Sequence, residues 1–249
     1  MTSLLAVLID GSIYASWLFL VAAGLTVIYG VMRILNMAHG SFYAIGAYSA
    51  ASLVGWYFNN GMGPAWVSYL LLVGAALVAG LIVGVIVERG LLRLMYGRDE
   101  ILMVIITYAL LLILEDGMKI VWGVSPYFAY QPYSELGRTS LGLLKVSNYD
   151  VALVGVSALL GLGLWAWLER TNQGKVLRAV IHDREIAVAM GVNVKLMFTI
   201  TFVLGTTLGA LAGAMSRYEF VLRFTLSHVA CHTTIVGTTE PNHLRANVS

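Results

Sequence analysis

Residues 11–32 read GSIYASWLFLVAAGLTVIYGVM, and no Asp, Glu, Lys or Arg occurs between Asp10 and Arg33. A helix that crosses the hydrocarbon core of a bilayer needs about 20 predominantly apolar residues. This stretch is long enough, and the first residues of the chain lack the cationic start of a cleaved secretory signal. We therefore predict a retained transmembrane helix at residues 11–31.

The positions of the charged residues predict five further spans. Residues 34–87 lack Asp, Glu, Lys and Arg but are far too long for one crossing, and the turn-forming segment 59–64, which reads NNGMGP, divides them. The predicted spans after the first lie at residues 40–58, 65–87, from 101 onward, 151–168 and 197–216. Near the far end of the span that begins at Ile101, Glu115 and Lys119 are spaced to form an i,i+4 ion pair at the membrane interface. A transport role for this pair is the alternative.

The composition agrees with a membrane protein. Of 249 residues, 59% are hydrophobic and 11% are charged, whereas soluble domains carry about 25% charged residues. The predicted fold class is an all-α, polytopic transmembrane helix bundle of about six spans in the lipid bilayer. A formal net charge of +2 does not indicate nucleic-acid binding, and a single cysteine, Cys231, excludes an internal disulfide.

The cationic side chains lie in alternate connectors. Short connectors rich in Lys and Arg remain in the cytoplasm. Six crossings place the connectors at Arg33, 88–100 and 169–197 on one side, and the turn at 59–64 and the loop 123–150 on the other. We therefore predict that both termini lie outside the cytoplasm. The cations of the two longer cytoplasmic connectors are Arg89, Arg93, Arg98, Arg170, Lys175, Arg178, Arg184 and Lys195.

Glycines at four-residue intervals predict close contacts between helices. In lipid, small residues let two backbones approach closely and so stabilise helix pairs. One stripe lies in the last predicted span and another in the third, and contact with a ligand is the alternative for both. The five helix-packing residues are Gly80, Gly84, Gly205, Gly209 and Gly213.

The chain carries no motif for catalysis or nucleotide binding. We find no G-x-x-x-x-G-K-[ST], H-E-x-x-H or G-x-S-x-G pattern. His228 and His232 are four residues apart but have no third ligand in the sequence nearby, so we predict no metal site, no cofactor and no catalytic residues. An intramembrane enzyme using Ser41 beside His39 is the weakest alternative.

Two segments are candidates for function. The first, between the first two spans, places polar residues and a glycine at or below the membrane surface; these are Asn36, His39, Gly40 and Ser41. Irregular backbone at this depth occurs where protein or water covers it, and broken helices often frame a transport pathway. We therefore predict that these residues line a pathway, with an ordinary interfacial turn as the alternative.

The second segment lies in the connector 169–197. Asp183 is a suitable N-cap and Gly191 a suitable residue just past a helix end. About two helical turns lie between them, with Ile186, Ala187 and Met190 expected on one side. Such an amphipathic helix can dock into a groove of a partner protein; a helix that merely lies on the membrane surface is the alternative.

Both segments resemble a known family. Residues 24–48, which read GLTVIYGVMRILNMAHGSFYAIGAY, resemble the start of a branched-chain amino acid ABC transporter permease, and are closer to the smaller of its two permease types. The stretch 169–213 is similar as well, with a Gly-x-x-x-Arg-Ala pattern from Gly174 to Ala179 and the sequence Gly-Val-Asn from Gly191. The resemblance covers roughly residues 1–215.

The resemblance implies an ATP-driven importer in the inner membrane that works by alternating access. A sister permease subunit would share the pathway, two ABC ATPase subunits would drive transport, and a periplasmic substrate-binding protein would deliver substrate. Residues 183–191 would couple the permease to the ATPase, and the residues implied are Asp183, Glu185, Ala187, Met190 and Gly191. A urea- or amide-type ABC permease, and a secondary transporter or channel working alone, are the alternatives.

The end of the chain departs from the family pattern. The resemblance implies two more spans after Gly213, but no apolar run of about 20 residues remains there. We therefore expect a permease domain at residues 1–216, with its coupling loop at 169–197, and an atypical tail at 217–249 that reflects a truncation or a change of reading frame.

Overall fold

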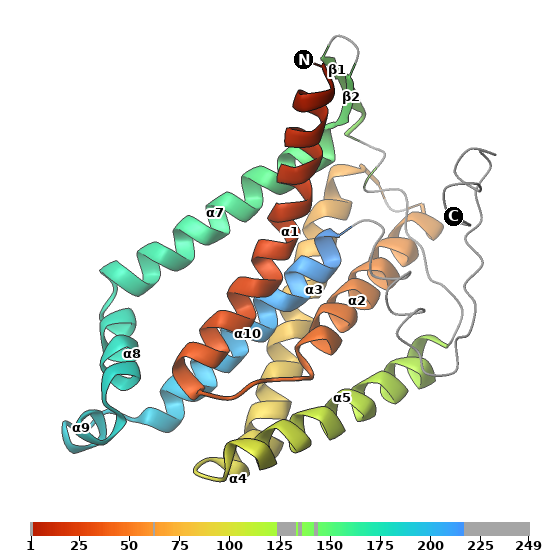
Figure 1. Ribbon diagram of the computed structural model, residues 1–249. Helices are drawn as coiled ribbons and strands as arrows, with labels where there is room; N and C mark the ends of the chain where they lie inside the picture. The colour runs from red at the N-terminus through yellow and green to blue at the C-terminus, as the bar shows by residue number, and fades with distance from the viewer. Residues whose placement is uncertain (1, 62, 124–132, 134–135, 142–143, 217–249) are drawn as a thin grey trace, which may run out of the picture. The chain divides into compact units, whose positions relative to one another are not determined.

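Long helices make up most of the chain. The computed structural model describes residues 2–61, 63–123, 133, 136–141 and 144–216, and the predicted tail at 217–249 lies outside this range (Figure 1). The six long helices are α1 (Thr2–Met32), α2 (His39–Asn59), α3 (Trp66–Val87), α5 (Glu100–Trp122), α7 (Asn148–Arg170) and α10 (Val194–Met215). The prediction of an all-α polytopic bundle is confirmed.

Five of these helices are long and apolar enough to cross a membrane by length and composition, and they contain the segments Val7–Met32, Trp66–Met95, Glu100–Trp122, Asn148–Arg170 and Val194–Met215. The sixth long helix, α2, has a suitable length of 21 residues but is more polar, with eleven of them buried against the rest of the chain. A helix that faces protein does not need a lipid-compatible surface. About six spans therefore remains a fair description.

Helix α10 lies at the centre of the bundle. It packs against α1, α2 and α3, and Figure 1 shows it running alongside all three. Of the most apolar 18-residue stretch of α10, 72% is buried, against 11% of the corresponding stretch of α7. Helix α10 is thus an internal element, whereas α7 packs mainly against α1 and α8 and leaves most of its surface to the surroundings.

The third span is longer than predicted. We expected it to end at residue 87, but the helix continues through a π-helical turn, η1 (Glu88–Leu92), into α4 (Arg93–Met95). The charge of Glu88 suggested a helix end at the membrane surface. The structure instead buries Glu88 completely, so that its charge no longer marks the boundary.

The connectors are sorted between the two ends of the bundle. Helix α4 lies at the same end as α8 (Asn172–His182) and α9 (Arg184–Ala189), whereas the N-terminus and a short hairpin lie at the other end (Figure 1). The hairpin, β1 (Arg138–Leu141) with β2 (Leu144–Ser147), is antiparallel and was not predicted. The arrangement agrees with the prediction that the cationic connectors share one side.

Helix α8 was also missed by the sequence analysis. The Thr171 side chain caps it by accepting a hydrogen bond from the Gly174 backbone N–H at 3.0 Å. Gly174, Leu177 and Val180 form its buried face, while Arg178 pairs with Glu169 at 2.7 Å across the α7–α8 corner. This pattern of apolar residues every third position was present in the sequence, but the many charges nearby suggested a loop.

The predicted ion pair in α5 is present. The Lys119 ammonium lies 2.8 Å from the Glu115 carboxylate and 3.3 Å from that of Asp116. Both side chains of the closer pair are partly exposed, and α5 carries them in its C-terminal half, away from α4. An interfacial pair of this kind contributes little to stability.

Candidate functional site

The linker between α1 and α2 is an extended segment held by α5. Ile34, Asn36 and Ala38 point inward, while the residues between them are exposed. The buried Thr107 hydroxyl of α5 shares its proton between the Leu35 carbonyl at 3.2 Å and the Val104 carbonyl at 3.0 Å, and it accepts a hydrogen bond from the Met37 N–H at 3.3 Å. The irregular backbone is therefore satisfied by protein, as membrane depth requires.

His39, the first residue of α2, lies where three helices meet. Its ring is buried, with Nε2 3.1 Å from the Val21 carbonyl of α1. A Cβ added at Gly24 of α1 or at Gly209 of α10 would lie 3.2–3.3 Å from this ring. Two glycines thus make the space that the imidazole fills.

The other predicted pathway residues differ in exposure. Asn36 and Ser41 are buried, whereas Gly40 is exposed with open space beside it. Asn36 accepts a hydrogen bond from the Ala38 N–H at 3.2 Å, and its Nδ2 has no partner in the described part of the chain. The predicted role of these residues in lining a pathway stays a prediction.

The predicted packing glycines all lie at contacts with α10. A Cβ at Gly205 would lie 2.6 Å from the Gly24 carbonyl oxygen, and one at Gly213 would collide with the Tyr43 carbonyl. From α3, a Cβ at Gly80 would lie 2.7 Å from Thr207 Cα, and one at Gly84 would collide with the Thr206 hydroxyl. Together with Gly209 beside His39, these positions allow three helices to approach the backbone of α10.

The predicted short helix at 183–191 is present as α9. The Asp183 carboxylate accepts a hydrogen bond from the Ile186 N–H at 2.9 Å and caps its start. At its end, Gly191 has φ +82°, the Gly191 N–H donates to the Val188 carbonyl, and the Val192 N–H donates to the Ala187 carbonyl. This pair of hydrogen bonds with a left-handed glycine is a Schellman motif, which ends a helix firmly.

The exposed apolar side chains of α9 and its C-cap do not include Ala187. Ile186, Val188 and Met190 are 63%, 55% and 80% exposed, and Glu185 is exposed as well. Ala187 is 4% exposed and packs in the hydrophobic core. The expectation that Ile186, Ala187 and Met190 share one side is therefore wrong, because α9 packs against α8 and α10 and turns Ala187 inward.

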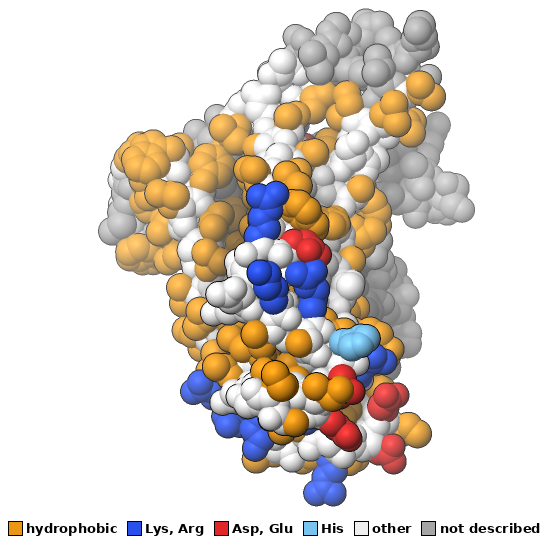
Figure 2. Space-filling view, turned by 90° about the vertical axis from the view of Figure 1, so that its left-hand side faces the viewer, with side chains coloured by type: hydrophobic (Ala, Val, Ile, Leu, Met, Phe, Trp, Pro, Cys, Tyr) orange, Lys and Arg blue, Asp and Glu red, His pale blue; other side chains and the backbone are white. Residues whose placement is uncertain are grey.

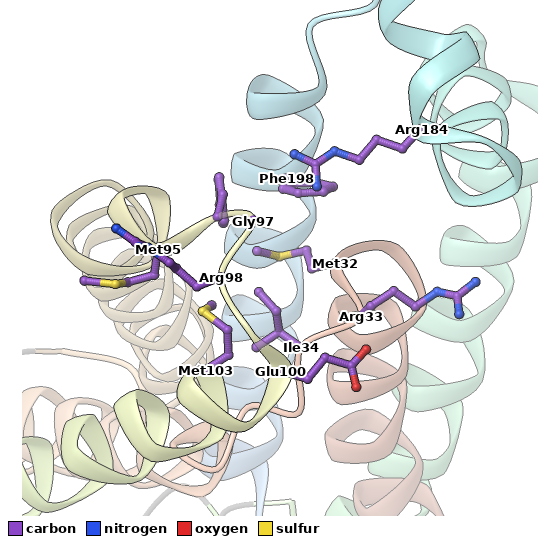
Figure 3. A pocket seen from close by; sticks show the side chains of 11 residues that line it. Met32, Arg33, Ile34, Met95, Gly97, Arg98, Glu100, Met103, Arg184 and Phe198 are labelled. Atoms are coloured by element: carbon purple, nitrogen blue, oxygen red, sulfur yellow. The ribbon is translucent and has the colours of Figure 1, made fainter.

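A pocket of about 170 Å³ lies beside α9. Its lining comes from the end of α1 and the linker after it, the segment from α4 into α5, the start of α9, and α10. Figure 3 shows the Arg184 side chain reaching over Phe198, with Met32, Ile34 and Met103 among the lining side chains. The Arg184 guanidinium carbon lies 5.1 Å from the Phe198 ring centroid, a cation–π distance. The remaining lining residues are Arg33, Met95, Tyr96, Gly97, Arg98 and Glu100.

Tyr96, which lines this pocket, belongs to a polar pair that was not predicted from the sequence. The Tyr96 hydroxyl donates a hydrogen bond of 2.6 Å to Oε1 of the fully buried Glu88. Burial, and then the bond to Glu88, raise the pKa of Tyr96, so its hydroxyl stays protonated and can donate. A tyrosine eight residues after an acid gave no recognisable signal, because side chains that meet on one face of a helix are three or four residues apart.

Charged side chains gather at the α9 end. Figure 2 shows Lys and Arg toward the lower half of the face that carries α7, α8 and α9, with largely hydrophobic side chains above them. Among the residues that the structure describes, no three His, Cys, Asp or Glu side chains are grouped to hold a metal ion. The candidate pair His228 and His232 lies outside those residues.

Known proteins resemble most of this chain. The family described as branched-chain amino acid transport system / permease component matches residues 7–227, and so extends past residue 216 into the predicted tail. The permease protein BraD of the high-affinity branched-chain amino acid transport system of Pseudomonas aeruginosa is 24% identical over 222 residues, which cover 86% of this chain and 70% of that protein.

Two further relatives carry the name LivH. The permease protein of Escherichia coli K12 is 24% identical over 212 residues, covering 82% of this chain and 66% of its own length. A probable permease of Methanocaldococcus jannaschii is 28% identical over 220 residues, covering 84% of this chain and 65% of its own length. This chain thus spans about two thirds of the length of these relatives, and no solved structure matches it significantly. With a family match over most of its length and a bundle of apolar helices, this multi-pass membrane protein belongs to the family of permease components of branched-chain amino acid transport systems.

Proposed function

We propose that this chain is the membrane-spanning permease subunit of an ATP-driven importer of branched-chain or related hydrophobic amino acids. The observation that carries the proposal is α9: a short, firmly capped helix with exposed apolar side chains, placed at the cationic end and joined within four residues to α10. The names of the relatives supply the substrate class. In this role the chain is a transport subunit, and ATP hydrolysis takes place on its partners.

We infer the partners from the family resemblance. A sister permease subunit completes the pathway, two ABC ATPase subunits bind at the α9 end, and a periplasmic substrate-binding protein delivers substrate at the hairpin end. This places α9 in the cytoplasm and both termini on the outer side of the inner membrane, in line with the distribution of Lys and Arg. Residues 1–216 form the permease domain, with 169–197 as its coupling loop.

The mechanism is alternating access. When the ATPases close, they displace α9, and α9 displaces α10 through the connection at 190–193. Because α10 packs on α1, α2 and α3, the bundle moves as a body and opens the pathway on one side at a time. Asn36, His39, Gly40 and Ser41 lie at the break between α1 and α2, where such a movement changes the packing.

The coupling residues have distinct parts in this scheme. Ile186 and Met190 bury their apolar side chains in the ATPase groove, and Glu185 adds a charge at its rim. Asp183 and Gly191 hold the two ends of α9, while Ala187 contacts the core of the chain itself and seats the helix.

The proposal is tested by co-purification of the chain with co-expressed ABC ATPase subunits from the same organism. We expect the wild-type chain to retain the ATPases and Met190→Asp to lose them, because a desolvated carboxylate has no place in an apolar groove. Leu136→Asp is the matched control, since Leu136 is an exposed apolar residue near the hairpin. A wild-type chain that never retains an ATPase would contradict the proposed function.

The substrate class is tested by uptake into proteoliposomes that contain the assembled transporter. Leucine, isoleucine and valine are compared with urea and acetamide, each radiolabelled and with ATP inside or outside the vesicle. We expect ATP-dependent import of the amino acids. Import of urea or acetamide alone would move the chain to the amide-type permeases, and import without ATP would favour a secondary transporter.

A further inference from the structure

A buried carboxylate lies where α3 continues into a π-helical turn. The proposed orientation places this end of α3 on the cytoplasmic side. Glu88 starts the π-helical turn η1 and is fully buried. π-Helical turns are rare and often lie at functional sites. Removing a carboxylate from water costs several kcal/mol unless partners compensate, so a buried ionisable group at membrane depth is itself a candidate for function.

This carboxylate is only half satisfied. Its Oε1 accepts the Tyr96 hydroxyl at 2.6 Å, whereas Oε2 has no hydrogen-bond partner among the described residues. A side chain needed only to fill space would be better replaced by an apolar one of similar volume. The single strong bond therefore points to a specific purpose for the link between Glu88 and Tyr96.

From Tyr96 a line of contacts leads to α9. The Tyr96 ring packs edge-to-face on Phe198 of α10, with centroids 5.0 Å apart and planes at 85°. The guanidinium of Arg184, the first residue of α9, lies over the same Phe198 ring. Figure 3 shows Arg184 extended from α9 over Phe198.

We propose that Glu88 and Tyr96 are positioning residues that tie α9 to the π-helical turn of α3 through Phe198 and Arg184. A displacement of α9 then moves the end of α3 directly, as well as α10. Without this relay (Glu88, Tyr96, Phe198 and Arg184), α3 would follow α9 through its packing on α10, which includes the contacts of Gly80 and Gly84. The role of this relay in transport rests on the proposed function, whereas all the contacts that form the relay lie within this chain.

A purely local role makes a different prediction. If the bond between Tyr96 and Glu88 only closes the turn after α4, removing it loosens the neighbouring residues 88–99 and nothing else. If the relay exists, removing it also loosens α9, which lies about 90 residues further along the chain. Hydrogen exchange of backbone amides measures both regions in one experiment.

The first experiment uses the purified full chain in detergent micelles. Tyr96→Phe keeps the ring on Phe198 and removes the hydroxyl, and we expect α9 amides at 186–191 to exchange about fivefold faster, as for the loss of one hydrogen bond. Glu88→Gln keeps an acceptor oxygen and should exchange close to wild type. Phe198→Leu removes the ring on which the two halves of the relay meet, and should match Tyr96→Phe at α9.

Tyr57→Phe is the matched control. It removes a tyrosine hydroxyl that donates to the Pro64 carbonyl at 3.0 Å in the turn between α2 and α3, and it should leave α9 exchange unchanged. Unchanged exchange at α9 in both Tyr96→Phe and Phe198→Leu would overturn the relay. An equal increase from Tyr57→Phe would do the same, because it would show a general loss of stability.

The second experiment measures ATP hydrolysed per leucine imported by the assembled transporter. Tyr96→Phe should raise this ratio at least twofold, while Tyr57→Phe should leave it unchanged. If the wild-type chain binds no ATPase but the variants show the expected exchange pattern, the proposed function is contradicted and the relay is supported. If the wild-type chain imports leucine but the variants lack that exchange pattern, the function is supported and the relay is contradicted.

Discussion

Gly205 of α10 and Gly24 of α1 lie so close together that a methyl group on either residue would meet the carbonyl oxygen of the other at 2.6 Å. Gly205→Ala therefore has to push the two helices apart. Overpacking of this kind costs about 1–3 kcal/mol, so we expect a lower melting temperature in detergent. Gly74→Ala in α3 is the control, because its Cβ would meet nothing within 4 Å and alanine favours the helix. Equal melting temperatures for the two variants would contradict this account of the helix contact.

Thr107 shows how one hydroxyl can hold an irregular segment. Thr107→Val keeps the shape of the side chain but leaves the Leu35 carbonyl and the Met37 N–H without their partner. An unsatisfied buried polar group costs about 1–3 kcal/mol, so we expect lower stability and faster proteolysis at residues 33–38. Thr207→Val removes only a bond to the Val203 carbonyl within its own helix and should change little. Resistance to proteolysis in Thr107→Val would show that the linker does not depend on α5.

At the scale of the element, α9 depends on its C-terminal cap. Gly191→Val forces a β-branched residue into a left-handed conformation at φ +82° and should cost about 1–3 kcal/mol of local strain. We expect α9 to fray and ATP hydrolysis to continue without proportionate uptake in the assembled transporter. Gly61→Val introduces similar strain at φ +62° in the turn after α2 and should keep the two activities coupled. Normal coupling in Gly191→Val would refute the docking role of residues 183–191.

Ala187→Phe tests the same helix from its buried side. Ala187 packs in the core, so a phenyl ring there must lift α9 off the bundle. We expect uptake to fall at least tenfold, while the ATPases still bind through Ile186 and Met190. Measuring retention and uptake on the same preparation separates this result from the loss of binding expected for Met190→Asp. Full uptake by Ala187→Phe would show that the seat of α9 plays no part in coupling.

At the scale of the whole molecule, the prediction is the sidedness of the connectors. In a Cys231→Ser background, single cysteines at Arg93, Lys175 and Asn60 are tested with a membrane-impermeant thiol reagent; all three positions are exposed. We expect labelling of the first two from the cytoplasm and of the third from outside, since the structure places α4 and α8 at one end of the bundle (Figure 1). Labelling of positions 93 and 175 from opposite sides would contradict both the topology and the docking role.

The sequence by itself determined the apolar helical stretches, the gathering of the cationic connectors at one end of the bundle, and where α9 begins and ends. These features are local: a charge or an open turn is costly in lipid, and a helix cap needs a particular residue at one position. The glycine stripes also indicated which faces pack closely. The family resemblance rested on these same segments, residues 24–48 and 169–213.

Only the tertiary structure decided that α10 is the centre of the bundle, that Ala187 turns inward, that His39 fills a space between two glycines, and that Glu88 is buried against Tyr96. Lipid and protein interior are equally apolar, so hydrophobicity along a chain does not tell which helix faces which. From the sequence alone, a charge at the end of an apolar run indicates the membrane surface. Glu88 is instead surrounded by protein and bonded to the Tyr96 hydroxyl, because the packing of the helices decides which groups lie away from water.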